Sequence, residues 1–272
     1  MASSSAKSPS LLTVTGKSTR HVNLLLINPN STQSMTDSCL KSIESTLPQH
    51  VTVYGFTCPE PGPSAVEGKV DAVISAADSF RALHPLLRAD PKRFDGFLVA
   101  CFSAHPLIAM LREEYEQPVM GIMEAALYAS RMCGESVGIV TTSERSAVMH
   151  ARSTVEYGFA NYSVGCETGH VSVLELESLP RDVVYAGLGA AAQRLVDKGA
   201  DCICLGCAGM TGMREAVSSA VGMDERKAMV VDGVAIGIHF LTALAQESLG
   251  TPKSGVYRSS AAGRARRGQQ WL

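Results

Sequence analysis

The sequence predicts an α/β fold of two pseudo-symmetric lobes, each a mostly parallel sheet flanked by helices, with a candidate active site in the cleft between them. Short apolar runs alternate along the chain with segments that carry apolar residues at helical spacing, which is typical of βα units. The second half of the chain also repeats the order of features of the first half. At several points an apolar run ends in a polar turn or a cysteine, and ligands of open α/β sheets bind beyond the carboxyl ends of the strands.

Seven apolar runs have the length of buried strands and are far too short to cross a membrane. These strands are expected at residues 22–27, 51–56, 95–101, 118–122, 136–141, 202–206 and 228–232. Helical spacing of apolar residues predicts the main helices at residues 64–89, 104–116, 144–157 and 182–198.

The repeat becomes visible when the two halves are compared. VNLLLINPNSTQSM (22–35) and ESVGIVTTSERSAVM (135–149) each contain a buried strand, a polar turn and the start of a helix. FDGFLVACFSAHPL (94–107) and ADCICLGCAGMTGM (200–213) each lead from an acidic residue through a strand to a cysteine. This similarity indicates duplication, and it predicts that both polar turns and both cysteines face one cleft.

The expected domain limits follow from this repeat. We expect lobe one to comprise residues 21–117 and 211–250, and lobe two to comprise residues 118–210. Residues 1–20 are polar, lack the apolar core of a signal peptide and are expected to form a flexible extension. Residues 251–272 carry several arginines among Ser, Gly and Ala and are expected to form a flexible basic tail.

Composition restricts the class of protein. A formal net charge of -2, with 18% charged and 46% hydrophobic residues, is ordinary for a globular protein and gives no electrostatic basis for nucleic-acid binding. Without a secretion signal, the 8 cysteines are expected to be reduced thiols in the cytoplasm. The expected partner is a small-molecule substrate, with no membrane association and a possible homo-oligomer.

Cys101 and Cys207 are the candidate catalytic residues. Each stands where a strand passes into a helix, and the free backbone N–H groups there are expected to lower the pKa of the thiol toward neutrality. A thiolate on one face of a carbon acid removes its proton while a thiol on the other face returns one, which inverts the stereocentre without a metal or an organic cofactor. Candidate donors to the developing oxyanion are the turn residues Asn28, Asn30, Ser31, Thr141 and Thr142.

The chain resembles the Asp/Glu/hydantoin racemase superfamily over about residues 20 to 245, and most closely its hydantoin and allantoin racemase branch, which includes the fungal Dcg1-like proteins. The resemblance is carried, in order, by INPNST (27–32), GPSAVEG (62–68), VACFSAHPL (99–107), GIMEAAL (121–127), VGIVTT (137–142) and LGCAGM (205–210). It implies two pseudo-symmetric lobes, Cys101 and Cys207 as the catalytic couple, and the NPNST and VTT turns as part of the substrate cradle. The residues directly after the cysteines are expected to complete that cradle: Phe102, Ser103, Ala208 and Gly209.

The chain departs from this branch after the first cysteine, where Ser103, Ala104 and His105 replace a Gly-Asp pair. His105 either pairs with Cys101 or caps the helix that begins at the following proline, and its place before a proline favours the cap. The departure leaves two alternatives open beside a racemase of cyclic ureides. One is a decarboxylase or isomerase of the same fold with a single essential cysteine, and the other is a non-catalytic ligand-binding protein.

The remaining thiols and histidines are expected to have ordinary roles. Cys202 and Cys204 lie on one face of their strand and are expected in the core. Since structural zinc needs four ligands at suitable spacing, no metal is expected. Glu67 is either an acid facing the cleft or part of the first turn of a helix, and His170 is a weaker cleft candidate. His150 has no recognisable partner in the sequence and is assigned no role.

Overall fold

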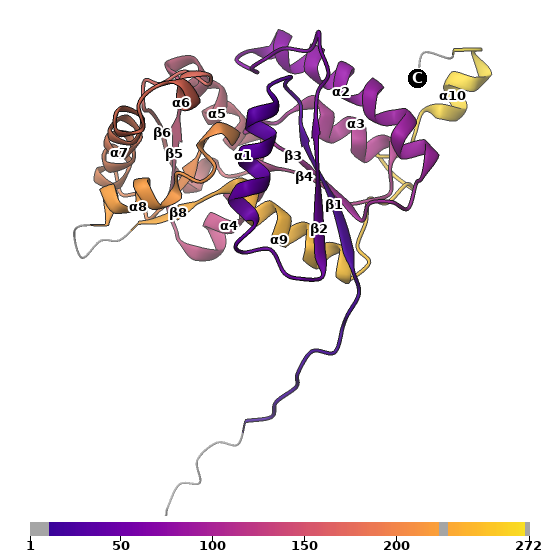
Figure 1. The fold of residues 1–272 in the computed structure, drawn as a ribbon, viewed down its shortest axis with the longest axis horizontal. Helices are drawn as coiled ribbons and strands as arrows, with labels where there is room; N and C mark the ends of the chain where they lie inside the picture. The colour runs from indigo at the N-terminus through magenta and orange to yellow at the C-terminus, as the bar shows by residue number, and fades with distance from the viewer. Residues whose placement is uncertain (1–10, 223–227, 270–272) are drawn as a thin grey trace, which may run out of the picture.

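The computed structural model describes residues 11–222 and 228–269, and within these it has two four-stranded parallel sheets. The first sheet has the strand order β2-β1-β3-β4, and the second has the order β6-β5-β7-β8. The two orders are equivalent, with β1 and β3 corresponding to β5 and β7. The prediction of two pseudo-symmetric α/β lobes is therefore confirmed, and Figure 1 shows the lobes side by side.

The strands are short and most of them are buried. Those of the first sheet are β1 (Val22–Asn28), β2 (Val51–Thr57), β3 (Gly96–Val99) and β4 (Val119–Gly121). Those of the second sheet are β5 (Val137–Thr141), β6 (Ser163–Thr168), β7 (Cys202–Leu205) and β8 (Met229–Val231). The α-helices are α1 (Gln33–Ile43), α2 (Lys69–Ala89), α3 (Pro106–Glu114), α4 (Ile122–Cys133), α5 (Glu144–Glu156), α6 (Glu175–Ser178), α7 (Arg181–Asp197), α8 (Arg214–Val221), α9 (Gly233–Gln246) and α10 (Ala261–Arg266). Two 3₁₀ helices, η1 (Ala160–Tyr162) and η2 (Ala208–Met210), complete the elements.

The core explains why β1 reads as an unbroken apolar run. Leu24 and Leu26 belong to an apolar cluster that contains residues of α4, α9 and strands of both sheets. Leu25 and Ile27 belong to a second cluster, which contains residues of α2 and α3. Successive side chains of a strand point to opposite faces, so a strand covered by helices on both faces must be apolar throughout. The first cluster continues into lobe two through Ile139, and this shared core holds the lobes together.

The expected lobe limits are wrong at two strands. Residues 119–121 pair with β3 in the first sheet, and residues 229–231 pair with β7 in the second. The chain therefore enters lobe two through α4, which contacts both sheets, and returns to lobe one only at α9, which packs on β1 and β3. Sequence pattern places a strand but does not say with which neighbour it pairs.

The sequence analysis did not predict strand β6. β6 (Ser163–Thr168) lies at the edge of the second sheet, and most of its residues are only half-buried. An edge strand needs no continuous apolar run, and SVGCET contains none. Cys202 and Cys204 in β7 are fully buried, which confirms their expected place in the core.

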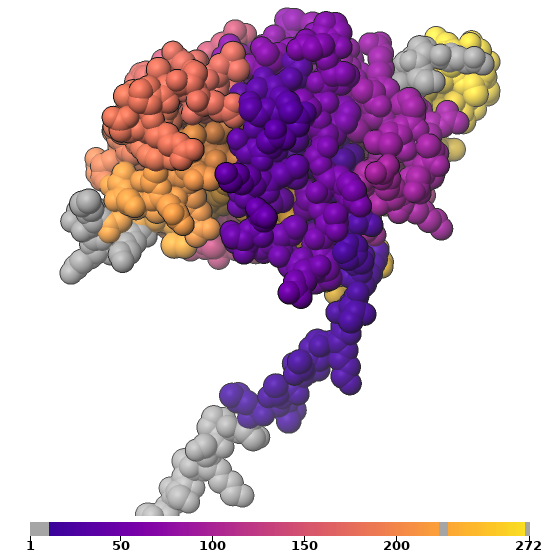
Figure 2. Space-filling view, in the orientation of Figure 1, coloured from indigo at the N-terminus to yellow at the C-terminus, as the bar shows by residue number. Residues whose placement is uncertain are grey.

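The C-terminal segment is not the free tail that its composition suggested. Residues 251–269 run back along the outer end of lobe one, and Figures 1 and 2 show α10 beside that lobe and away from lobe two. Arg264, 8% exposed, donates from Nη2 to Glu114 Oε1 at 2.7 Å, while the Thr251 backbone N–H donates to the Glu116 carbonyl at 2.7 Å. Lys253 Nζ donates to the carbonyl of Arg112. The segment is an ordered part of lobe one.

We expect Arg264→Ala to release this segment, because the substitution removes the cation paired with the largely covered carboxylate of Glu114. Breaking one side of a buried ion pair costs about 3–5 kcal/mol, which here lowers the free energy of local opening. Amide hydrogen exchange of residues 251–269 should then accelerate while the sheets stay protected. Arg266→Ala, at an exposed position of the same helix, is the control. Unchanged exchange in Arg264→Ala would mean that the ion pair does not hold the segment.

Residues 11–20 form no helix or strand, and their side chains are exposed. Figure 1 shows them running away from both lobes. Each helix within the described residues is too short or too polar to span a lipid bilayer.

Candidate active site

The two cysteines occupy equivalent positions in the two lobes. β3 ends at Val99 and β7 ends at Leu205, so Cys101 and Cys207 each lie two residues beyond the carboxyl end of a central strand. Both line one cavity of about 50 Å³ to which both lobes contribute. Its wall consists of Pro29, Asn30, Met35, Val66, Ala100, Cys101, Phe102, Thr142, Ser146, His150, Val173, Gly206, Cys207 and Ala208. The predicted cleft thus brings the two thiols to one space.

An annex of about 290 Å³ continues this cavity toward the surface on the Cys101 side. It shares Val66, Cys101, Phe102, Ser146 and His150 with the cavity and adds charged residues at its rim. Glu67 is one of these, which places it at the cleft rather than within α2. A larger hollow of about 770 Å³ lies elsewhere, near Asp95 and Pro118 at the amino ends of β3 and β4, and none of its described lining residues is a cysteine or histidine.

The thiols have different polar partners. Cys101 Sγ lies 3.3 Å from Ser103 Oγ. Cys207 is the N-cap of η2, and its Sγ accepts a hydrogen bond from the backbone N–H of Gly209 at 3.4 Å. Both partners stabilise a negative charge on sulfur. The expected N–H donor at a strand end is therefore present at Cys207, and a hydroxyl takes its place at Cys101.

Burial nevertheless outweighs these donors. It raises the pKa of Cys101 to about 11 and that of Cys207 to about 12, although the hydrogen bonds from Ser103 and from the backbone of Gly209 act in the opposite direction. Negative charge on Cys101 contributes further to the raised pKa of Cys207. The expectation of lowered thiol pKa values is thus wrong for this form of the cleft, because desolvation of the two thiols disfavours thiolate. In this form both groups are neutral thiols at pH 7.

Thiol labelling should report these raised pKa values. We expect iodoacetamide to modify Cys101 and Cys207 much more slowly at pH 7 than the exposed Cys133, with rates that rise about tenfold per pH unit toward pH 11. Since the folded-state pKa values lie above the unfolded ones, their contribution to stability is complete below about pH 8.5 and is lost as the pH rises toward 11 to 12. Peptide mass spectrometry across pH measures the rates. Fast labelling of both cysteines at pH 7 would contradict this description.

In the NPNST turn of lobe one, one residue lines the cavity, and two others hold the backbone around it. Asn30 lines the cavity, and its Oδ1 accepts from Asn28 Nδ2 at 3.0 Å and from the Thr32 backbone N–H at 2.9 Å. Asn28 is buried below it and does not line the cavity. Ser31 donates from Oγ to the Gly62 carbonyl and fixes the neighbouring loop. Of the three, only Asn30 is in place to meet a ligand in this cavity.

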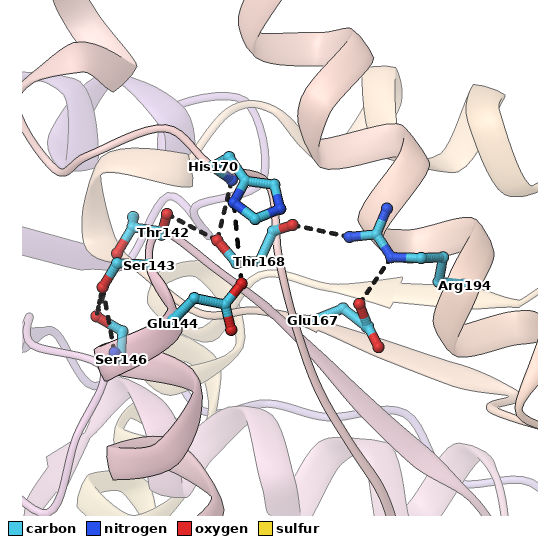
Figure 3. A network of polar contacts seen from close by, with 8 residues as sticks. All are labelled: Thr142, Ser143, Glu144, Ser146, Glu167, Thr168, His170 and Arg194. Atoms are coloured by element: carbon cyan, nitrogen blue, oxygen red, sulfur yellow. Dashed lines mark hydrogen bonds and ion pairs between the residues drawn. The ribbon is translucent and has the colours of Figure 1, made fainter.

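The VTT turn of lobe two divides in the same way, and Figure 3 shows Thr142 with its partners Ser146 and Thr168. Thr142 lines the cavity with its Oγ1 3.3 Å from Ser146 Oγ, whereas Thr141 is fully buried and does not line the cavity. Thr168 holds the turn from behind by donating from Oγ1 to the Thr142 carbonyl at 2.9 Å. His170, the weaker cleft candidate, is 71% exposed, with Nδ1 3.9 Å from Glu144, and it does not line the cavity.

The residues beside the cysteines also have distinct places. Phe102 and Ala208 line the cavity, Ser103 lines the annex, and Gly209 supplies its N–H to Cys207. Gly206 donates its N–H to the Val140 carbonyl at 2.8 Å, and a Cβ at this position would lie 2.3 Å from that oxygen. Only glycine allows β7 to approach β5 this closely before Cys207.

His105 does not pair with Cys101. It is the N-cap of α3, where its Nδ1 accepts from the Leu107 backbone N–H at 3.3 Å and its Nε2 lies 3.1 Å from Ser75 Oγ. The capping interpretation is therefore confirmed. Burial lowers the pKa of His105 to about 4, in keeping with a neutral structural imidazole.

Sequence reasoning missed several lining residues. Ser146 and His150 lie one helical turn apart on α5, on the face that covers Cys101 and Phe102. A signal for them existed, because this helix starts directly after the VTT turn, and residues three or four apart share a helix face. Met35, Val66 and Val173 were not named as lining residues either, although Val66 lies in the GPSAVEG motif (62–68) that carries the family resemblance.

Comparison with known proteins finds relatives that match most of the chain. The family model described as Asp/Glu/Hydantoin racemase matches residues 24–241. An uncharacterized protein of Schizosaccharomyces pombe is 38% identical over 244 residues, which are 88% of this chain and 98% of that protein. A hydantoin racemase of Rhizobium meliloti is 28% identical over 87% of this chain and 94% of its own length.

A solved structure adds the fold to this similarity. The crystal structure of allantoin racemase from Pseudomonas fluorescens matches with a TM-score of 0.78 and 25% identity, covering 88% of this chain and 97% of that one. The family match covers both lobes and both cysteines. The chain belongs to the Asp/Glu/hydantoin racemase family of isomerases.

Proposed function

We propose that the protein is a cofactor-independent racemase of a cyclic ureide, in which Cys101 and Cys207 are the paired acid and base. The observation that carries this proposal is the placement of both thiols on the wall of one cavity, each two residues beyond an equivalent strand of its lobe. Relatives that are a hydantoin racemase and an allantoin racemase favour a ureide as the substrate class.

The proposed reaction exchanges one proton on each face of the stereogenic carbon. The thiolate of one cysteine takes the proton, and the C–H electron pair moves into the adjacent carbonyl to give an enolate. The thiol of the other cysteine then returns a proton to the opposite face, so the two cysteines exchange protonation states with each turnover. The reverse reaction starts from the exchanged pair.

The enolate oxygen needs hydrogen-bond donors, and each lobe supplies one. The Oδ1 of Asn30 accepts from Asn28 and Thr32, while the partner of its Nδ2 among the described residues is Met35 Sδ at 3.4 Å. Since a thioether is a weak acceptor, this amide N–H is available to a better one. The hydroxyl of Thr142 faces the same cavity from lobe two. Both donors are fixed before substrate arrives, which is the arrangement that stabilises developing charge.

We expect substrate to widen the gap between the thiols as it binds. The space between them is only about 50 Å³, less than a ureide ring fills, whereas the annex of about 290 Å³ leads into it from the surface. The two lobes are joined by the shared core around α4 and α9, so we expect them to separate by a small rotation. Opening also admits water to the thiols, which favours the thiolate that the closed cleft disfavours.

Incubation of the wild-type protein with single enantiomers in D₂O tests this function. Candidate substrates are 5-substituted hydantoins, allantoin and free amino acids, followed by polarimetry and by NMR of the α position. Loss of optical rotation with deuterium at the stereocentre is the expected result for a ureide. Release of CO₂ would instead support the one-cysteine decarboxylase, and binding without exchange would support a ligand-binding protein.

A further inference from the structure

One face of helix α1 in lobe one carries serines that contact lobe two. Ser34, Ser38 and Ser42 are spaced four residues apart, which places them on the same face of the helix. Ser34 Oγ donates to Glu177 Oε2 at 2.6 Å, and Ser38 Oγ donates to Glu177 Oε1 at 3.5 Å. Farther along the helix, Ser42 Oγ lies 2.9 Å from Thr211 Oγ1. Besides sharing an apolar core, the lobes are therefore joined by hydrogen bonds along α1.

The carboxylate of Glu177 suits the amino end of α1. Glu177 lies on the short helix α6, and both of its carboxylate oxygens accept from serines of α1. Hydrogen bonds to an ionised acceptor are shorter and stronger than those between neutral groups, and the 2.6 Å contact with Ser34 is of this kind. Since Ser34 is the second residue of α1, the negative charge also lies near the positive end of the helix dipole. We call these two hydrogen bonds of Glu177 the interlobe contact.

The lobe-two end of the interlobe contact is fixed to the backbone that holds Cys207. Leu176, the neighbour of Glu177, is 4% exposed and belongs to the apolar core of lobe two. A Cβ at Gly209 would lie 3.0 Å from Leu176 Cδ1 and 3.7 Å from Cys207 Sγ. Leu176 therefore packs directly on the residue whose backbone N–H donates to this thiol. Any movement of α6 is transmitted to Cys207 through this packing.

The lobe-one end of the interlobe contact is equally close to the candidate active site. Met35 follows Ser34 in α1, is 2% exposed and lines the cavity, where its Sδ is the partner of Asn30 Nδ2. Ser34 itself lines a separate hollow of about 490 Å³, together with Leu176 and Glu177. Each end of the Ser34 to Glu177 hydrogen bond is thus one residue away from a side chain that packs against the site.

We propose that Glu177 is a positioning residue that holds the lobes together and thereby sets the distance across which the two candidate catalytic thiols face each other. Its hydrogen bonds from Ser34 and Ser38 break when the lobes rotate apart about their shared core, and they form again when the cleft closes. Glu177 does not line the cavity, so it acts through α1 and α6 and not on a ligand. This role is independent of the substrate class proposed above.

Thiol labelling tests this role without any substrate. The rate at which iodoacetamide modifies Cys101 and Cys207 rises with the fraction of molecules in which the cleft is open. Relative to the exposed Cys133, we expect Glu177→Ala to raise both rates about 3- to 10-fold, the effect of one lost hydrogen bond. Ser34→Ala should give a similar increase. The double variant should add little, because both substitutions remove the same contact.

Glu177→Gln separates the hydrogen bonds from the charge. Its amide oxygen remains an acceptor for Ser34, so we expect labelling within about twofold of the wild-type rate. Burial raises the pKa of Cys207, and the charge of Glu177 adds a smaller contribution. Cys101 lies in the other lobe, and its labelling reports opening without this charge effect. Asp182→Ala removes an exposed carboxylate from the first turn of α7 and should label as wild type does.

Each outcome supports or overturns the role of Glu177. Wild-type rates at both thiols in Ser34→Ala and Glu177→Ala would show that the interlobe contact does not hold the lobes. Equal increases in Glu177→Gln and Glu177→Ala would trace the effect to charge and overturn the inference. The fully buried Cys204 reports global unfolding, so an equal increase at this thiol would overturn it as well. If Glu177→Ala does not fold, Ser34→Ala decides. Absence of racemisation in the wild type would refute only the proposed function.

Discussion

Replacing either Cys101 or Cys207 by serine is expected to lower the rate of racemisation by about 10²- to 10⁴-fold, whichever enantiomer is supplied. A serine hydroxyl has nearly the size of the thiol but is far too weakly acidic to act as base or to return a proton at neutral pH. Because inversion needs one group on each face of the carbon, the loss of either group stops it. Polarimetry from each pure enantiomer, with NMR of the α proton, measures the effect.

Cys133→Ser is the matched control, because this thiol is exposed and lies outside the cavity. It should racemise at the wild-type rate. A Cys101→Ser protein that keeps the wild-type rate would reduce the proposal to a single essential cysteine, as in the decarboxylase alternative. The same result for both variants would exclude the thiols from the reaction.

Gly206→Ala is expected to have the second largest effect. The new methyl group would lie 2.3 Å from the Val140 carbonyl oxygen and 3.0 Å from Ile139 Cγ2, so β7 must move away from β5 just before Cys207. Overpacking of this kind costs about 1–3 kcal/mol of folding free energy. A displacement of a reacting group by about 1 Å lowers a catalytic rate by about 10²-fold. Denaturant unfolding and the racemisation assay measure the two effects.

Gly255→Ala is the control for replacing a glycine by alanine without a steric clash, since a Cβ at position 255 meets no atom within 4 Å. It should change neither stability nor rate beyond experimental error. If Gly206→Ala matched this control in both measurements, the close approach of β7 to β5 would have no part in placing Cys207.

Strand ends were the most predictable part of this protein. An apolar run followed by a polar turn or a cysteine marks where a buried strand ends, and in a parallel sheet such ends share one edge. That pattern alone places Asn30, Cys101, Thr142 and Cys207 around one cavity. It does not separate residues that face the cavity from those that support the turn, as Asn28 and Thr141 do, because two adjacent turn residues carry the same local pattern.

Long-range effects were not predictable. The assignment of β4 and β8 to their sheets depends on strand pairing. The docking of residues 251–269 depends on a contact between Arg264 and Glu114, which are 150 positions apart in the sequence. The thiol pKa values depend on how completely the lobes exclude water. His150 acquires its place only because α5 turns that face toward Cys101. Each of these results from packing between segments distant in sequence.

The most direct test of the two-cysteine reaction is where deuterium first appears when one pure enantiomer reacts in D₂O. If the thiols work from opposite faces, the newly formed enantiomer should carry deuterium from its first appearance while the remaining substrate keeps its protium. Product that retains the original proton at the stereocentre would mean that a single group carries it from one face to the other, and the two-cysteine mechanism would be wrong.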